Sequence, residues 1–285
     1  MDWRERRERF RAVLAGSHCI GPASVFDPLS ARIAEEIGFE AGMFAGSVAS
    51  LTVLGAPDIV LLSATEFAHQ AYRICRASTL PLIVDADHGY GNALNVRATV
   101  SELETAGVSA LTIEDTSLPR AFGATKSGLI SIDEAVGKLR AAVDGREDRR
   151  LVLVGRTNVA AAGLDNALSR VKAYARTGVD AIFLARLKTR EELDALASAV
   201  ELPLMLGSVP AEMKDYDYLA SRKVRVCLQG HKPIMAAVQA VHDTLLAQRS
   251  TGPTSIPVPT QVSAELLAHL TRADHYERSI KDFLA

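Results

Sequence analysis

The chain has 285 residues and a formal net charge of −2, and 48% of its residues are hydrophobic. A charge so near zero offers no broad basic surface, which argues against nucleic acid or an anionic membrane as a partner. No apolar run reaches the roughly 18 residues of a membrane span, and no signal-peptide pattern is seen, so we expect a soluble, cytoplasmic protein. The three cysteines are scattered and predict buried, inert thiols rather than disulfides or a zinc site.

Short apolar runs alternate with amphipathic stretches along most of the chain, after an N-terminal segment, WRERRERFR, whose mixed charges predict a solvated helix face. The predicted strands are, in order, Ile20–Phe26, Ala41–Ala45, Leu82–Val84, Ala110–Ile113, Leu151–Val154, Ala181–Leu184, Leu204–Leu206 and Val224–Leu228. Between them, apolar residues recur at three- and four-residue steps, as in helices. Eight such units over about 250 residues predict an α/β fold, a (β/α)8 TIM barrel, in preference to a doubly wound open sheet.

The sequence predicts that the alternation of strands and helices stops before the C-terminal end of the chain. Residues 1–248 are assigned to the barrel with its N-terminal helix, and a helix at about 232–248 is expected to close the barrel. Residues 249–262 read as a polar, proline-rich linker. Residues 263–285 form a C-terminal helical segment, which on such a tether is expected to dock on a neighbouring subunit.

In a TIM barrel, catalytic side chains lie at the C-terminal ends of the strands, which together form the barrel mouth. The residues that end the predicted strands are Asp27, Gly46, Ser47, Asp85, Asp87, Glu114, Asp115, Arg156, Thr157, Asn158, Arg186, Gly207, Ser208, Gln229, Gly230 and His231. Several acids and two arginines are therefore expected to meet there. Asp85 and Asp87 are two residues apart and face the same side of their strand, so a divalent cation would relieve their repulsion.

Each of these residues also has a structural interpretation. The paired aspartates could cap a turn, and Glu114 could be the partner of a lysine. Arg156 could merely neutralise the acids, although its planar fork suits a substrate carboxylate. Ser47 could be a small packing residue, and His231 could cap the last helix. The chain has no P-loop, no dinucleotide fingerprint and no G-x-S-x-G elbow, and no lysine ends a strand.

Four segments, SVFDPLSARIAEEIGFEAGMFAGS, DADHGYGN, TIEDTSLPR and GRTN, resemble the isocitrate lyase/phosphoenolpyruvate mutase superfamily over roughly the whole barrel. The resemblance implies a barrel whose C-terminal helix is swapped onto a neighbour, in a homotetramer built as a dimer of dimers. It also implies a Mg²⁺ site, which Mn²⁺ is expected to be able to fill. Asp85 would be the main ligand, with Asp87, Asp58 and Glu114 acting through water.

The same resemblance implies that Gly46, Ser47 and Arg156 hold the carboxylate of a small 2-oxo acid, with Asp87 and His231 beside it. Residues 118–130, LPRAFGATKSGLI, lack the K-x-C-G-H acid motif of the lyases, whereas glycine followed by His231 resembles the oxaloacetate decarboxylase branch. A tyrosine expected in that branch after strand 7 is absent from LGSVP at 206–210.

This resemblance favours a carbon–carbon lyase that decarboxylates oxaloacetate, or a close 2-oxo acid, to pyruvate and CO₂. Loss of CO₂ leaves an enolate, whose charge a divalent cation stabilises. Arg156 and His231 would be the catalytic residues, with His231 protonating C3. The alternatives are a 2-methylisocitrate-type lyase, a phosphonopyruvate-processing enzyme, and a non-catalytic protein that binds 2-oxo acids.

Overall fold

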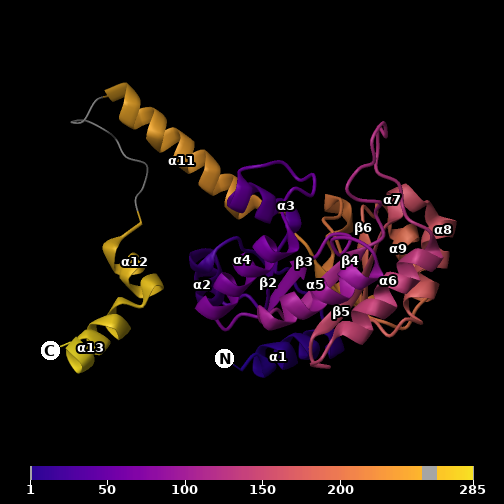
Figure 1. The fold of residues 1–285 in the computed structure, drawn as a ribbon, viewed down its shortest axis with the longest axis horizontal. Helices are drawn as coiled ribbons and strands as arrows, with labels where there is room; N and C mark the ends of the chain where they lie inside the picture. The colour runs from indigo at the N-terminus through magenta and orange to yellow at the C-terminus, as the bar shows by residue number, and fades with distance from the viewer. Residues whose placement is uncertain (1, 252–261, 285) are drawn as a thin grey trace.

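The computed structural model describes residues 2–251 and 262–284. Eight parallel strands form one sheet in chain order (Figure 1). They are β1 (Ala23–Ser24), β2 (Gly42–Phe44), β3 (Leu82–Asp85), β4 (Ala110–Glu114), β5 (Val152–Asn158), β6 (Ala181–Ala185), β7 (Leu204–Leu206) and β8 (Val224–Cys227). All eight predicted strands are confirmed, although β1 is shorter than predicted.

The strands are accompanied by helices, most of which cover the outside of the sheet. They are α1 (Arg4–Ala15), α2 (Pro28–Ile37), α3 (Gly46–Ala49), α4 (Ala64–Ala77), α5 (Ala93–Thr105), α6 (Ile132–Gly145), α7 (Val159–Ala162), α8 (Leu164–Tyr174), α9 (Arg190–Ser198), α10 (Tyr216–Ser221), α11 (Lys232–Thr251), α12 (Ala264–Thr271) and α13 (Ala273–Leu284). A π-helical turn, Ser50–Leu54, follows α3, and a 3-10 turn, Ala211–Met213, follows β7. Within the described part of the chain, no helix is long and apolar enough to cross a membrane.

The sheet closes on itself just before β1. Ile20 forms a parallel bridge with Val226 of β8. The N–H of Ile20 donates to the carbonyl of Arg225, and the N–H of Cys227 donates to the carbonyl of Ile20, both at 2.9 Å. The closed ring confirms the predicted TIM-barrel fold and brings the C-terminal ends of all eight strands to one mouth.

The strands are apolar because both of their faces are buried, as expected for parallel strands between a barrel interior and a ring of helices. The three cysteines are free and buried, and burial raises the pKa of both the Cys19 and the Cys75 thiol to about 12. The prediction that the cysteines are buried is confirmed.

Helix α1 lies across the N-terminal ends of the strands. Arg7 is buried and donates to the carbonyls of Glu104 and Val108, and Arg6 is buried and donates to that of Cys75. The prediction that this segment is a wholly solvated face is therefore wrong for both arginines. Their guanidinium groups satisfy carbonyls in the last turns of α4 and α5 and in the loop before β4, and the sequence does not show those carbonyls.

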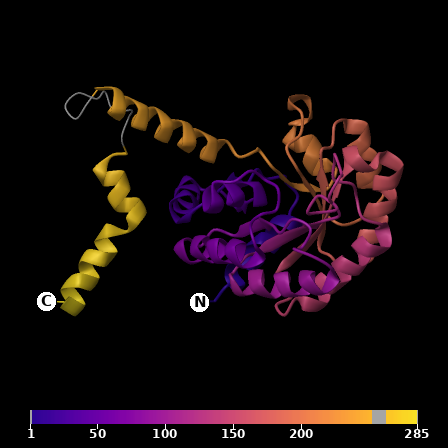
Figure 2. The same ribbon diagram turned by 45° about the horizontal axis from the view of Figure 1, so that its top comes forward.

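Helix α11 does not close the barrel, contrary to the prediction. It follows β8 but extends away from the ring of helices, as two views at 45° to each other show (Figures 1 and 2). Its residues Met235, Val238, Val241 and Leu245 are each about half exposed. These four residues recur every three or four positions and therefore form one apolar stripe, which no other described part of the chain covers.

The C-terminal segment is two helices rather than the single one predicted, because Arg272 between α12 and α13 adopts a left-handed conformation with φ 59°. Helix α12 packs on α2 through Leu270, whose carbonyl accepts a hydrogen bond from Arg32 at 2.9 Å. Most of the predicted linker, residues 252–261, lies outside the described residues.

Candidate active site

Three charged residues from adjacent strands meet at the barrel mouth. Asp85 ends β3, Glu114 ends β4, and Arg156 lies in β5 in register with Glu114. Arg156 donates from Nη1 to Asp85, and its Nη2 lies 3.0 Å from Oε2 of Glu114. The guanidinium also lies 5.2 Å from the centre of the Phe183 ring on β6. The arginine is therefore held by two carboxylates and an aromatic face, and Glu114 has an arginine rather than a lysine as its partner.

Asp85 is the best anchored of the acids. It is buried, and its Oδ1 accepts a hydrogen bond from Thr112 Oγ1 at 3.0 Å and one from the N–H of Asp87 at 3.2 Å. Asp85 thus does stabilise the turn, as the structural interpretation allows, while its Oδ2 accepts from Arg156. Both oxygens have fixed positions, which suits a group that must present charge at a defined place.

Asp87 turns back toward α3. Its backbone adopts φ 46°, and a Cβ atom built on Gly46 would lie only 2.8 Å from its Oδ1. Any larger residue at position 46 would therefore displace this carboxylate. Ser47 follows at the start of α3 and is half-buried, so it is not a fully packed core residue.

The carboxylates carry more negative charge than Arg156 can balance. Burial, together with Asp85, Glu114 and Asp58, raises the pKa of Asp87 to about 8. The pKa of Glu114 is raised by burial, against the opposing effect of Arg156. The pKa of Asp58 is raised by partial desolvation and by Asp85. Three raised carboxyl pKa values around one arginine indicate a site that favours an added cation.

This donor set fits Mg²⁺ in one particular way. Among the described residues, no three acid, histidine or cysteine side chains are arranged as ready-made direct ligands. Mg²⁺ commonly keeps several waters and takes only one or two protein carboxylates. The arrangement therefore suits an ion held by Asp85, with Asp87, Glu114 and Asp58 reaching it through water, as the family resemblance implies.

His231 lies on the opposite side of the mouth, after β8. Its Nδ1 is 2.9 Å from Ser24 Oγ at the end of β1. Burial lowers the pKa of His231, whereas Asp85 and Asp58 act to raise it, so the imidazole lies within electrostatic reach of both acids. Gly230 has φ 83°, a conformation that a glycine adopts without strain, and it turns the chain from β8 to this histidine.

Two predicted mouth acids lie elsewhere. Asp27 caps α2, accepting a hydrogen bond from the N–H of Ser30 at 2.7 Å in a reciprocal capping box. Asp115 is buried and accepts hydrogen bonds from Arg170 at 3.0 Å and from Tyr174 at 2.7 Å. It alternates with Glu114 along β4 and therefore points out of the barrel. The prediction that these two aspartates belong to the mouth is wrong.

Three supporting residues were not singled out from the sequence. They are Thr112 beside Asp85, Phe183 beside Arg156 and Ser24 beside His231. Thr112 and Ser24 are polar residues inside apolar strands, and that pattern could have indicated them. Nothing in the sequence distinguishes Phe183 from an ordinary core aromatic.

The loop after β4 is anchored at its base and open at its tip. Thr116 and Leu129 form an antiparallel bridge, and the N–H of Ser117 donates to the carbonyl of Gly128 at 2.8 Å. Phe122, between these pairs, is fully exposed. In this conformation the loop stands away from the barrel (Figure 1) and brings no acid to the mouth.

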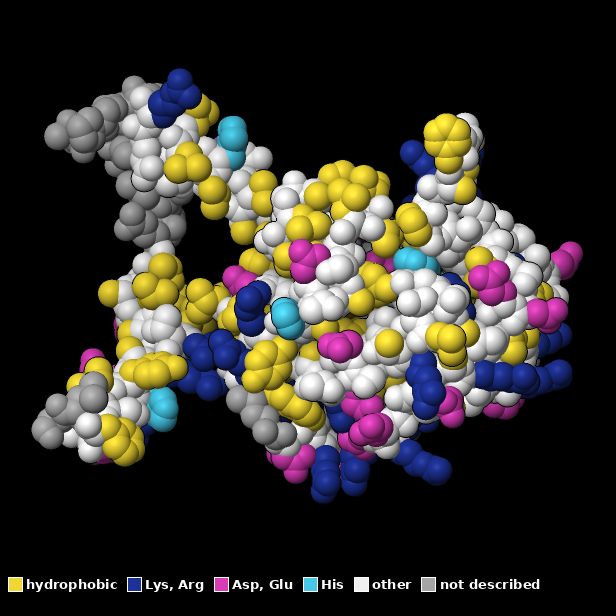
Figure 3. All heavy atoms as spheres, in the orientation of Figure 1, with side chains coloured by type: hydrophobic (Ala, Val, Ile, Leu, Met, Phe, Trp, Pro, Cys, Tyr) yellow, Lys and Arg dark blue, Asp and Glu magenta, His cyan; other side chains and the backbone are white. Residues whose placement is uncertain are grey.

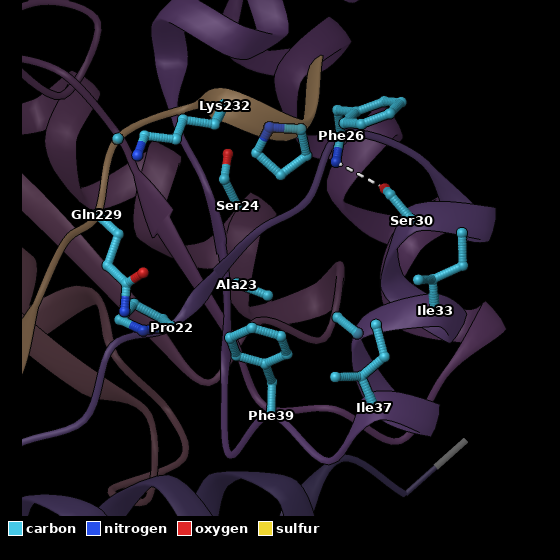
Figure 4. A pocket seen from close by; sticks show the side chains of 13 residues that line it. Pro22, Ala23, Ser24, Phe26, Ser30, Ile33, Ile37, Phe39, Gln229 and Lys232 are labelled. Carbon is cyan, nitrogen blue, oxygen red and sulfur yellow. Dashed lines mark hydrogen bonds between the residues drawn. The ribbon is translucent and has the colours of Figure 1, made fainter. Parts of the chain in front are cut away.

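An apolar groove lies away from the acid cluster. A groove of about 410 Å³ runs along the outside of β1 and α2 (Figure 4). Its lining includes Phe26, Ile33, Ile37 and Phe39. Figure 3 shows hydrophobic side chains exposed at several places on the face of the molecule that it draws. The groove contains none of the mouth carboxylates and does not fit a small, doubly charged acid.

Comparison with known proteins identifies the family. The profile of the phosphoenolpyruvate phosphomutase family matches residues 10–248. The chain belongs to this family. A protein of Bradyrhizobium sp. (strain ORS 278) named oxaloacetate decarboxylase is 53% identical over 285 residues, covering 100% of this chain and 99% of that protein.

Solved structures of the phosphoenolpyruvate phosphomutase family share the fold. The phosphoenolpyruvate phosphomutase of Streptomyces platensis subsp. rosaceus matches with a TM-score of 0.87 and 27% identity, covering 98% of this chain and 99% of that one. Phosphonopyruvate hydrolase in complex with oxalate and Mg²⁺ matches with a TM-score of 0.86 and 29% identity, with the same coverage. The predicted superfamily resemblance is confirmed.

Proposed function

We propose that this protein decarboxylates oxaloacetate to pyruvate and CO₂ with the help of a divalent cation, Mg²⁺ or Mn²⁺. The observation that carries the proposal is the joining of Arg156 to Asp85 and Glu114 at one mouth, within electrostatic reach of His231. A relative that is 53% identical over its full length carries the name oxaloacetate decarboxylase, which supports the same activity. The predicted cytoplasmic location stays a prediction.

The residues at the mouth would have two roles, which are to hold the substrate and to balance charge. We assign the carboxylate next to the keto group to Arg156, Ser47 and the backbone at Gly46, because a guanidinium fork binds carboxylates in two parallel hydrogen bonds. Asp85 would hold Mg²⁺, with Asp87, Glu114 and Asp58 reaching it through water. When bound, Mg²⁺ would supply Lewis-acid stabilisation of the negative charge that develops on the keto oxygen.

His231 has the second role. As CO₂ leaves C3, the electron pair of the broken bond spreads onto the keto oxygen, and a proton must then reach C3. His231 lies at the mouth, where Asp85 and Asp58 both act to raise its pKa. Burial lowers its pKa, so in the empty mouth the ring is neutral near pH 7. The negative charge of bound substrate favours its protonated form, from which Nε2 can give the proton.

The first test is a coupled pyruvate assay with oxaloacetate, with Mg²⁺ or with EDTA, after subtraction of the spontaneous reaction. We expect turnover that depends on Mg²⁺. His231→Ala should lower kcat by about 100-fold or more, since a positioned general acid contributes about 10²–10⁴-fold. His18→Ala is the matched control, because His18 is exposed beside Glu40 and precedes the first strand, and it should leave kcat unchanged.

Two results would count against this assignment. Equal pyruvate formation by His231→Ala and the wild type would remove His231 from the chemistry. Oxalate binding without any turnover of oxaloacetate would favour a binding protein. 2-Methylisocitrate and phosphonopyruvate serve as comparison substrates, and no turnover of either is expected because the 118–130 loop carries no cysteine or histidine.

We also propose that the protein forms a helix-swapped homotetramer, a dimer of dimers. The groove beside β1 and α2 is where the helix that follows the eighth strand normally packs in a TIM barrel. Helix α11 leaves that place open and exposes an apolar stripe of its own. The occupant that fits both features is α11 of a second copy, because an isologous exchange covers two grooves and two stripes at once.

The assembly is tested by light scattering on the wild type and on the double variant Val238→Asp/Val241→Asp. We expect the wild type to have the mass of a tetramer and the variant to have a smaller mass, because two charges in an apolar interface are poorly tolerated. Leu94→Asp is the control, since Leu94 on α5 is 76% exposed and lies outside the stripe. A monomeric wild type, or a tetrameric double variant, would contradict the proposal.

A further inference from the structure

The contact between Ser24 and His231 joins the first and last strands of the barrel. Ser24 ends β1, and His231 follows β8, 207 positions later. The Ser24 side chain is nearly buried, and it lies below the segment that leads to Lys232 (Figure 4). Its hydroxyl oxygen is 2.9 Å from Nδ1 of the imidazole. Neither the family resemblance nor the mouth carboxylates required a polar residue here.

We propose that Ser24 is the positioning residue for His231: it donates its hydroxyl proton to Nδ1, fixes the ring, and keeps the exchangeable proton of the neutral imidazole on Nε2. The proposal rests on the role assigned to His231 above. A neutral imidazole has one donor and one acceptor nitrogen, so whatever bonds to one nitrogen decides what the other can do.

The direction of this hydrogen bond follows from the other contacts. Among the described residues, no carbonyl or carboxylate accepts a hydrogen bond from the Ser24 hydroxyl, and His231 is the partner found. A hydroxyl that donates to Nδ1 leaves the hydrogen of the neutral ring on Nε2, the nitrogen that is left for the substrate.

A serine suits this place better than a charged partner. A hydroxyl can donate to Nδ1 when the ring is neutral and accept from it when the ring is protonated. The ring can therefore take up a solvent proton at Nδ1 when substrate binds, give its Nε2 proton to C3, and then recover a proton on Nε2 from solvent, with Ser24 as its anchor in each state. An aspartate at position 24 would instead stabilise the protonated form permanently.

The anchor itself is rigid. Ser24 is paired in register with Met43 of β2, and Gly230, with φ 83°, directs the chain from β8 to His231. A catalytic group held from a strand is placed more accurately than one held from a loop. Loss of the hydroxyl should therefore disturb the orientation of the imidazole rather than the binding of the substrate.

The test combines kinetics with ¹⁵N NMR of the protein labelled at histidine, with the His231 signals assigned by their loss in His231→Ala. In the wild type, the spectrum of the metal-free protein should show His231 as the Nε2–H tautomer. Ser24→Ala should give mixed tautomers and should lower kcat by about 5- to 10-fold, the usual effect of one lost hydrogen bond, with KM nearly unchanged. Ser24→Thr keeps the hydroxyl and should restore both the tautomer and kcat.

Two further variants separate positioning from a general packing effect. Ser109→Ala removes another buried serine hydroxyl, at the N-terminal end of β4, and should change neither the spectrum nor kcat. In a His231→Ala background, Ser24→Ala should have no additional effect on kcat, because the group it positions is gone.

The proposal is overturned if Ser24→Ala leaves the His231 tautomer unchanged, or if it lowers kcat equally with and without His231. Failure of the wider assignment looks different: His231→Ala would then retain full activity, while the NMR spectra would still decide whether Ser24 sets the tautomer. If the spectrum of Ser24→Ala shows general unfolding, Ser24→Thr is the deciding variant. It must then match the wild type in both the His231 tautomer and kcat.

Discussion

Asp85→Asn is expected to lower Mg²⁺-dependent kcat by about 100- to 1,000-fold, the range seen when one group that stabilises developing charge is removed. Asp85 is placed by Thr112 and is paired with Arg156, so the variant removes a fixed negative charge where the cation is proposed to bind. Asp27→Asn is the matched control, because Asn caps a helix about as well as Asp does, and it should leave kcat unchanged.

Asp85→Asn also has a readout that does not depend on turnover. Mg²⁺ alone, at about 100 times its Kd, should stabilise the wild-type fold by about 2.7 kcal/mol, measured as a rise in Tm. The variant should show a much smaller rise. An equal rise in both proteins would place the cation away from Asp85.

The rise in Tm that Mg²⁺ causes is also expected to depend on pH. The pKa of Asp87 is raised to about 8 in the folded protein, so the metal-free fold binds more protons than the unfolded chain between about pH 4 and pH 8. This contribution makes the metal-free protein less stable as pH rises through that window. Binding of Mg²⁺ requires the ionised carboxylate, so the rise in Tm caused by Mg²⁺ should be larger at pH 8 than at pH 6.

Arg156→Ala should lower kcat/KM by about 1,000-fold, because two charge-assisted hydrogen bonds to a substrate carboxylate are worth about 1.5–3 kcal/mol each. The variant also leaves Asp85 and Glu114 without their cation, so we expect a lower Tm in the absence of Mg²⁺. Arg156→Lys keeps the charge but loses the fork, and it should fall between the two proteins.

Binding of oxalate, measured by calorimetry, separates the two effects of Arg156→Ala. Weak oxalate binding together with a low kcat/KM would support direct contact with the carboxylate. Unchanged oxalate binding would reduce Arg156 to the role of neutralising the acids. Arg97→Ala is the control, since Arg97 forms an exposed ion pair with Asp144 at 3.2 Å, and exposed pairs contribute little.

The fold was predictable because parallel strands buried on both faces must be apolar throughout, and the helices between them must be amphipathic. That alternation located all eight strands, including β7 with only three residues. The acids at the ends of β3 and β4 could also be predicted as site residues, since a carboxylate at the end of a buried strand has few purely structural uses. The order of the strands then placed Asp85, Glu114 and Arg156 side by side.

Other features depended on long-range packing. Asp27 and Asp115 also follow or end strands, but one caps α2 and the other pairs with Arg170, and only the direction of each side chain distinguishes them from Asp85. Whether α11 returns to its own barrel depends on the turn after Gly230, not on the apolar pattern of the helix, which suits either partner. The hydrogen bond between Ser24 and His231 joins the two ends of the barrel. Local sequence determines which residues are buried and which strands end in charge, whereas such contacts between distant segments exist only once the chain has closed on itself.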